Sequence, residues 1–223
     1  MVTTVAGMAG MAGMTGSRDD IGTAARFGNP VGVAVDGAGN LYVADFYNST
    51  IRKVETIFRA VTTLAGMAGM TGSDDGKGTS ARFNAPSGVA VDDKGYLYVT
   101  DYGNHTIRRV ETSTGVVTTL AGAAGMSGSV DAIGAAARFN MPARVTVDGA
   151  GNLYIADWGN FTIRQIALAK AAVTTTFMGV AGQRGVKLGA LPGGLNKPAG
   201  IAVSPTGGFF IIDLSENAVL TVR

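Results

Sequence analysis

The sequence predicts an all-β fold, a β-propeller of four blades with four antiparallel strands in each blade. Three observations predict it: a repeat of 56 residues, four short strand signals in each repeat, and no long stretch with helical periodicity. The period is carried by one series of prolines and one of aspartates: Pro30, Pro86, Pro142 and Pro198; Asp45, Asp101, Asp157 and Asp213. Several units of four strands are typical of a propeller with one blade per repeat.

The strand signals are clearest in the second repeat. In order, they are the apolar run "GVAV", the alternating "LYVTD", the β-branched "TIRRV" and the Thr/Val-rich "VTTLAG". Turn residues separate them, with Asp-Gly at 36–37 and 148–149 and Gly-Asn at 103–104 and 159–160. Residues 26–54 aligned without gaps on 82–110 give 18 identities in 29 positions, so the repeats share one local structure.

A glycine- and methionine-rich loop precedes each of the first three repeats. The stretch "GMAGMAGMTGS" at 7–17 recurs in shorter form at 66–73 and 122–129, and no Lys or Arg stands before Arg18. This recurrence favours a loop of the fold over a targeting peptide, whose leader needs a basic start. Methionine thioethers suit Cu(I), but the loop holds no histidine, so we expect apolar packing there and no metal.

Composition excludes several classes of function. The net charge is only +2 and the basic residues are dispersed, which argues against nucleic-acid binding. No apolar run is long enough for a membrane helix, and the absence of cysteine excludes disulfides and thiolate chemistry. We expect no cofactor, because neither a histidine cluster nor closely spaced glutamates are present.

The repeated pattern resembles the NHL repeat. The residues that carry the resemblance are "P-x-G-V-A-V-D", "G-x-L-Y-V-x-D" and "N-x-x-I-R-x-V", and "Asn104-His105" keeps the first two letters of the motif. It is specific in the first three repeats and weaker in the fourth, where Tyr and Arg are lost. The resemblance implies a propeller, usually of six blades, used mainly for binding and sometimes for catalysis, in a bacterial protein that is secreted or at the cell surface.

The two ends of the chain predict how the ring closes. Residues 2–7, "VTTVAG", read as a fourth strand with no blade before it, and the last repeat ends after its third strand. We therefore expect one domain over 1–223, in which the strand 2–7 pairs with the last blade at 199–223 and leaves no open edge. This gives a four-bladed monomer; a two-chain ring of eight blades is the alternative.

Strand polarity predicts one face for a ligand. The loops after the second and fourth strands of each blade share a face, and there the residue after the periodic aspartate is Phe46, Tyr102, Trp158 or Leu214. Three aromatic rings could stack on a sugar or hold a peptide, or could simply pack against the neighbouring blade. The periodic aspartates and the asparagines Asn48, Asn104, Asn160 and Asn217 are expected to be structural, the asparagines through left-handed turns.

The clearest break in the repeat is Arg144. Its equivalents are Gly32, Gly88 and Gly200, and two residues later Thr146 replaces an alanine. An arginine at the mouth of a central channel could bind an anion or carboxylate, with drift in one blade as the competing interpretation. The single histidine, His105, is expected on an exposed loop of the same face, which completes the candidate ligand-binding set.

These observations favour a non-enzymatic propeller that binds a protein, peptide or carbohydrate on this face. The alternative is a small hydrolase or lyase that acts at the central channel. Aspartate pairs at 19–20, 74–75 and 92–93 could bind calcium weakly, but none has the spacing of an EF-hand loop.

Overall fold

The computed structural model describes residues 1–8, 15–204 and 207–222. They form two compact units, the first made of 1–99 with 109–118 and the second of 100–108 with 119–223. Each unit is described by itself below. The expectation of a single domain over 1–223 stays a prediction.

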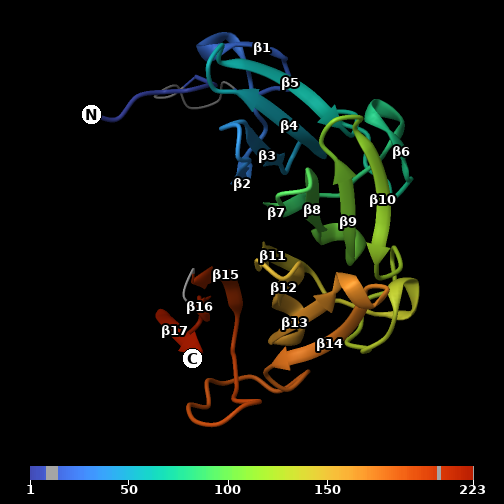
Figure 1. Ribbon diagram of the computed structural model, residues 1–223, viewed down its shortest axis with the longest axis vertical. Coiled ribbons are helices and arrows are strands. Elements are labelled where there is room, and N and C mark those ends of the chain that lie inside the picture. The colour runs from blue at the N-terminus through green and yellow to red at the C-terminus, as the bar shows by residue number, and fades with distance from the viewer. Residues whose placement is uncertain (9–14, 205–206, 223) are drawn as a thin grey trace. The chain divides into compact units, whose positions relative to one another are not determined.

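The described residues form four antiparallel sheets, drawn in Figure 1. The first sheet has the order β1-β5-β4-β3-β2 and the second β6-β10-β9-β8-β7. The third has the order β11-β12-β13-β14 and the fourth β15-β16-β17. The strands are β1 (Asp20–Ile21), β2 (Pro30–Val35), β3 (Leu41–Asp45), β4 (Thr50–Glu55), β5 (Ala60–Ala65), β6 (Gly76–Lys77), β7 (Pro86–Val91), β8 (Tyr96–Asp101), β9 (Thr106–Glu111), β10 (Val116–Ala121), β11 (Pro142–Val147), β12 (Asn152–Asp157), β13 (Thr162–Ala167), β14 (Val173–Met178), β15 (Pro198–Ser204), β16 (Gly208–Asp213) and β17 (Ala218–Val222).

The only helices in the described part of the chain are single 3₁₀ turns. They are η1 (Gly22–Ala24), η2 (Gly78–Ser80), η3 (Tyr102–Asn104), η4 (Gly134–Ala136), η5 (Trp158–Asn160) and η6 (Leu168–Lys170). Over those same residues, no helix has the length and apolar character needed to cross a membrane.

The all-β, four-bladed prediction is confirmed at the level of the sheets, but the strand counts differ. The first two sheets gain a short fifth strand from the loop that precedes the repeat, because β1 pairs with β5 and β6 with β10. The fourth sheet has three strands. Residues 2–7 form no strand in the structure, so their pairing with the last sheet stays a prediction.

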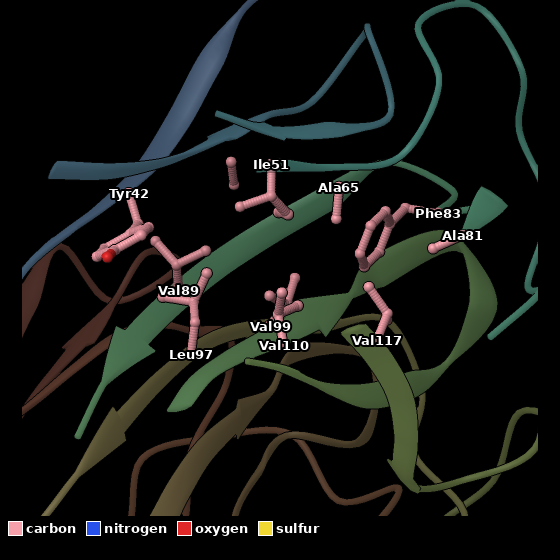
Figure 2. Close-up of a cluster of buried hydrophobic side chains, with 11 residues drawn as sticks. Tyr42, Ile51, Ala65, Ala81, Phe83, Val89, Leu97, Val99, Val110 and Val117 are labelled. Carbon is pink, nitrogen blue, oxygen red and sulfur yellow. The ribbon is translucent and has the colours of Figure 1, made fainter. Parts of the chain in front are cut away.

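Successive residues of each strand point to opposite faces of the sheet, and both faces carry apolar side chains. In the first sheet, Val33, Leu41 and Val43 lie on what we call the leading face, and Tyr42 and Ile51 lie on the trailing face. The trailing face of the first sheet packs on the leading face of the second, and Figure 2 shows the resulting core. Its buried members are Tyr42, Ala44, Ile51, Ala65, Ala81, Phe83, Val89, Leu97, Val99, Val110 and Val117.

The same packing recurs inside the second unit. Tyr154, Ala156 and Ile163 on the trailing face of the third sheet pack against Ile211 and Leu195 of the fourth repeat. The recurrence follows from the sequence period, since equivalent positions of successive repeats carry similar apolar residues. In both units, therefore, the trailing face of one sheet packs on the leading face of the next sheet.

In each of the first three sheets, a buried ion pair lies beside the end of the second strand. Arg164 on β13 is fully buried, and its guanidinium is 3.1 Å from the carboxylate of Asp157 and also pairs with Asp131. The amide of Asn160 donates to Asp157 at 2.7 Å, and the Arg164 guanidinium lies 5.1 Å from the centroid of the Phe139 ring. Because every charged group here has a partner, burial of the arginine is tolerated.

The predicted left-handed conformation holds for Asn217 but is wrong for Asn48, Asn104 and Asn160. In these turns the residues with left-handed backbone are Ser49, His105, Phe161 and Asn217. In the first three repeats, the left-handed residue is therefore the one that follows the asparagine. Asn217 therefore belongs to a different position of the repeat from the other three, and Glu216 is their equivalent. The first three asparagines serve the fold through their amides, which donate to the periodic aspartates.

Candidate ligand-binding site in the second unit

The candidate site begins where the second strand of the third sheet ends. Asp157 closes β12, and Trp158 opens the turn η5 directly after it. The carboxylate of Asp157 accepts the backbone N–H of Asn140 at 2.8 Å, which ties the turn to the start of β11. Pro142 on β11 pairs with Asp157, so the strand begins where β12 ends, as strand polarity predicts.

Two of the three predicted aromatic residues come together in this unit. The rings of Tyr102 and Trp158 lie with their centroids 6.4 Å apart and their planes at 49°. The ammonium of Lys197 lies 5.2 Å from the centroid of the Trp158 ring. Both aromatic residues are half-buried, so part of each ring packs and part is accessible.

His105 lies beside this aromatic pair and is less exposed than expected. It is half-buried, and its Nδ1 accepts the backbone N–H of Met141 at 3.0 Å. The Met141 sulfur is also 3.3 Å from the hydroxyl oxygen of Tyr102. Burial lowers the pKa of His105, which together with the accepted hydrogen bond favours a neutral ring whose Nε2 carries the proton.

Arg144 occupies a position where the first sheet tolerates no side chain. A Cβ added to Gly32 would overlap the carbonyl oxygen of Ser87 on the neighbouring sheet. On β11, by contrast, Arg144 is half-buried and its guanidinium donates to the carbonyl of Ala143 at 3.0 Å. Burial lowers the pKa of Arg144, but a guanidinium remains charged at neutral pH.

Thr146 follows two residues later on the same face of β11. It pairs with Tyr154 of β12 and is half-buried. The β11 strand also lies against the η5 turn that carries Trp158. The structure therefore places Arg144 and Thr146 on the strand next to the aromatic pair.

The third predicted aromatic residue, Phe46, lies in the first unit. Its ring is half-buried and packs edge-on against exposed Tyr47, with centroids 5.5 Å apart. Phe46 is therefore the first-unit counterpart of Trp158.

The apolar packing expected of the methionine loops is not what the structure shows, because Met67, Met70 and Met126 are exposed. Met11 and Met14 lie outside the described residues. The guanidinium of Arg82 donates to the sulfur of Met67 at 3.8 Å. The guanidinium of Arg138 donates to the sulfur of Met126 at 3.7 Å. Over the part of the chain that the structure describes, no three His, Cys, Asp or Glu side chains are grouped to hold a metal. Asp19 of the first aspartate pair is engaged by Arg52 at 2.6 Å.

Burial and hydrogen bonding shift the pKa values of Asp157 and Asp148 in opposite directions. Burial raises the pKa of Asp157 to about 6, against the hydrogen bonds from Asn140, Asn160 and Arg164 that lower it. For Asp148, burial also acts to raise the pKa, but hydrogen bonds led by those from Asn152 outweigh it and the net shift is downward. Each group serves the fold, since its partners are turn and strand residues.

Sequence reasoning missed Lys197. The residues at its position in the earlier repeats are Asn29, Ala85 and Met141, so the position differs in every repeat and no pattern marked the lysine. It also missed the burial of the arginines at Arg52, Arg108 and Arg164. Their signal was the constant spacing of seven residues from the periodic aspartates.

The family model for the NHL repeat matches residues 27–54, 83–110 and 139–166. The chain therefore carries three NHL repeats. This confirms the resemblance seen in the sequence, and it places Phe46, Tyr102 and Trp158 at the same position of the first, second and third repeat. The fourth repeat lies outside the matched ranges.

Two curated relatives match less than half of the chain. One is Protein SUPPRESSOR OF QUENCHING 1, chloroplastic, from Arabidopsis thaliana, 35% identical over 100 residues. The other is NHL repeat-containing protein 2 from Homo sapiens, 36% identical over 107 residues. These alignments cover 45% and 47% of this chain but only 9% and 15% of the relatives' own lengths.

Solved structures share the fold at low sequence identity. An auxiliary nutrient binding protein from Bacteroides thetaiotaomicron matches 90% of this chain and 49% of its own, with a TM-score of 0.72 and 19% identity. A gluconolactonase from Xanthomonas campestris matches 87% of this chain and 58% of its own, with a TM-score of 0.62 and 14% identity. At these identities the likeness establishes the fold alone.

Proposed function

We propose that this NHL-repeat chain is a binding protein whose second unit holds a carboxylate-bearing ligand beside Trp158. The observation that carries the proposal is the aromatic pair Tyr102–Trp158 with the Lys197 ammonium over the indole ring. An aromatic surface contacts the apolar face of a sugar or a peptide side chain, and the adjacent cations attract its carboxylate. The fold shared with a protein described as nutrient binding is in keeping with this proposal.

Arg144 supplies the second cation of the proposed site. Its guanidinium can bind a carboxylate through two parallel hydrogen bonds, which a lysine ammonium does not do. Thr146 and the Nε2–H of His105 add hydrogen-bonding groups on the same unit. The ligand chemistry that suits this set is a uronic acid sugar or the free C-terminus of a peptide that ends in an aromatic residue.

Isothermal titration with matched probes tests the proposal. The sugar arm uses oligogalacturonate and its methyl ester, and the peptide arm uses a peptide ending in tyrosine with a free or an amidated C-terminus. The proposal expects one charged probe to bind, and its neutral partner to bind at least tenfold more weakly. Equal binding of charged and neutral probes, or binding of none of them, would contradict it.

The alternative of a hydrolase or lyase rests on fold likeness to the gluconolactonase, which at 14% identity does not extend to chemistry. A panel of lactones and aryl esters tests it directly. Turnover that is lost in an Arg144→Gly variant would favour the enzyme over the binding protein.

A further inference from the structure

The loop that joins β14 to β15, residues 179–197, differs in charge from its counterparts in the earlier repeats (Figure 1). At one position of the repeat those loops carry an acidic residue, namely Asp19, Asp75 or Asp131. Asp131 pairs with the buried Arg164, but Leu220 replaces that arginine in the fourth repeat, so the fourth loop needs no carboxylate to neutralise it. The fourth loop has no Asp or Glu, and its charged residues are Arg184, Lys187 and Lys197.

This loop lines a pocket of about 400 Å³ inside the second unit. Arg184, Lys187 and Gln183 contribute to the lining, and the other lining residues are glycine, alanine, valine and proline. Both cations are exposed, and neither forms an ion pair with another described residue. A cleft whose charges are all of one sign raises the local concentration of the opposite ion, so this pocket favours an anionic group.

Gly194 gives this loop a path that the earlier loops do not follow. The earlier repeats have an arginine at its position, and each of these guanidinium groups donates to a carbonyl of the 3₁₀ turn before it: Arg26, Arg82 and Arg138. A Cβ at position 194 would overlap the carbonyl oxygen of Gly185, so an arginine does not fit there. Instead, the backbone groups of Gly194 and Lys187 bond to each other in both directions, at 3.1 and 3.3 Å. These bonds hold Lys187 at the wall of the pocket.

The pocket lies beside the turn that carries Trp158. The Arg184 guanidinium is 4.8 Å from the centroid of the Phe161 ring, and Phe161 directly follows the η5 turn that Trp158 opens. This ring contact orients the guanidinium at the pocket. Gly194 of the pocket wall stands three residues before Lys197, whose ammonium lies over the Trp158 ring, and three residues span at most about 11 Å. One extended ligand can therefore contact both places.

We infer that this pocket binds a second carboxylate of the ligand proposed for the Trp158 site, and that the ligand is a polyuronate, a polysaccharide with one carboxylate on each sugar. The inference rests on the proposed function and chooses between its two ligand classes. A peptide C-terminus offers a single carboxylate, whereas successive sugars of a polyuronate offer one for each place. Arg184 suits the carboxylate, and the Gln183 amide, which both donates and accepts hydrogen bonds, suits the neighbouring sugar hydroxyls.

Isothermal titration with galacturonic acid and with a long oligogalacturonate tests whether two places are contacted at once. A single sugar reaches one place, and the oligomer reaches both. Because linked binding groups bind more tightly than either group alone, we expect the oligomer to bind at least about tenfold more tightly per sugar than the monomer. Equal affinity per sugar would overturn the second contact.

Charge-removing variants locate the second contact. In the double variant Arg184→Gln and Lys187→Gln, we expect the oligomer to lose its advantage over the monomer. Lys187→Gln alone should weaken oligomer binding, and Lys170→Gln is its matched control. Both remove the charge of one exposed lysine, but Lys170 lies in the turn between β13 and β14, at the other end of the sheet. Equal losses in the two lysine variants would show a general effect of charge and overturn the pocket assignment.

Poly-glutamate separates an acidic sugar chain from an acidic peptide. It carries one carboxylate per residue but no sugar ring or hydroxyl, so we expect it to bind at least tenfold more weakly than the oligogalacturonate. Equal binding would overturn the choice of a sugar.

The outcomes also separate this inference from the proposed function. If Trp158→Ala weakens oligogalacturonate binding and the double variant does not, or if only the peptide ending in tyrosine binds, the Trp158 site stands and the inference fails. If no probe binds, both fail.

Discussion

The first and third sheets share one buried polar arrangement and differ in what they present near it. The pair Arg52–Asp45 and the pair Arg164–Asp157 both span 3.1 Å, and Asn48 and Asn160 each donate to their aspartate at 2.7 Å. Yet Gly32 in one repeat is Arg144 in the other, and Phe46 is Trp158. The buried Arg–Asp–Asn arrangement that the repeats share serves the fold. The residues that differ, Arg144 and Trp158, are those that we place in the ligand site.

The largest expected effect is on stability and is the same in both sheets. Arg164→Leu leaves the Asp157 carboxylate buried without its cation, and we expect a loss of about 3–5 kcal/mol in the free energy of unfolding. Arg52→Leu should lose a similar amount. Urea unfolding measures both, with Lys53→Met as control because the Lys53–Glu55 pair is more exposed and should be worth under about 1 kcal/mol. A loss in only one of the two sheets would break the comparison.

The next effect separates the two sheets. Gly32→Ala should cost about 1–3 kcal/mol, because the added Cβ would overlap the Ser87 carbonyl oxygen. Arg144→Gly should cost about 1 kcal/mol or less, the entropy of a glycine in a strand. Gly37→Ala is the control, since a Cβ there meets no atom within 4 Å. Equal costs at positions 32 and 144 would mean that the sheets tolerate side chains alike there.

A smaller effect concerns the ligand. With the charged probe that binds, Trp158→Ala should weaken affinity at least tenfold, about 1.4 kcal/mol, because it removes the ring beneath the Lys197 ammonium. Phe46→Ala should change affinity less than threefold. Titration of both variants decides the matter, and a larger loss for Phe46→Ala would place the ligand on the first unit instead.

The smallest effect is on the pH dependence of stability. Hydrogen bonds led by those from Asn152 hold the pKa of Asp148 below its ordinary value of 3.8. A carboxyl whose pKa is lower in the folded chain adds stability above its unfolded pKa and loses it as the pH falls through the folded value. Asp148→Asn should therefore flatten the acid limb below about pH 4. Thermal melts over the acid range measure this, and an unchanged limb would show that Asp148 makes no such contribution.

Much of the fold could be predicted from the sequence because the period is carried by residues with local roles. The periodic prolines open β2 and β11, the periodic aspartates close β3 and β12, and the structure pairs Pro30 with Asp45 and Pro142 with Asp157. The short β1 and β6 strands could not be predicted, since Asp20–Ile21 and Gly76–Lys77 lie in glycine-rich loops without strand propensity.

The site was predicted only in part because packing decides it. The sequence indicated Tyr102 and Trp158, but only tertiary contacts bring the two rings together with Lys197 from the fourth repeat. His105 was expected to be exposed, and it is half-buried because Met141 contacts its ring. A polar residue at a left-handed turn gives no sign in the sequence of which neighbour will cover it.

The exchange of the differing residues tests the central claim most directly. The triple variant Arg144→Gly, Thr146→Ala and Trp158→Phe gives the third sheet the residues of the first at these positions. We predict that its free energy of unfolding stays within about 2 kcal/mol of the wild type, while its affinity for the charged probe falls at least tenfold. Retained affinity in this variant, or an affinity lost only together with the fold, would contradict the account.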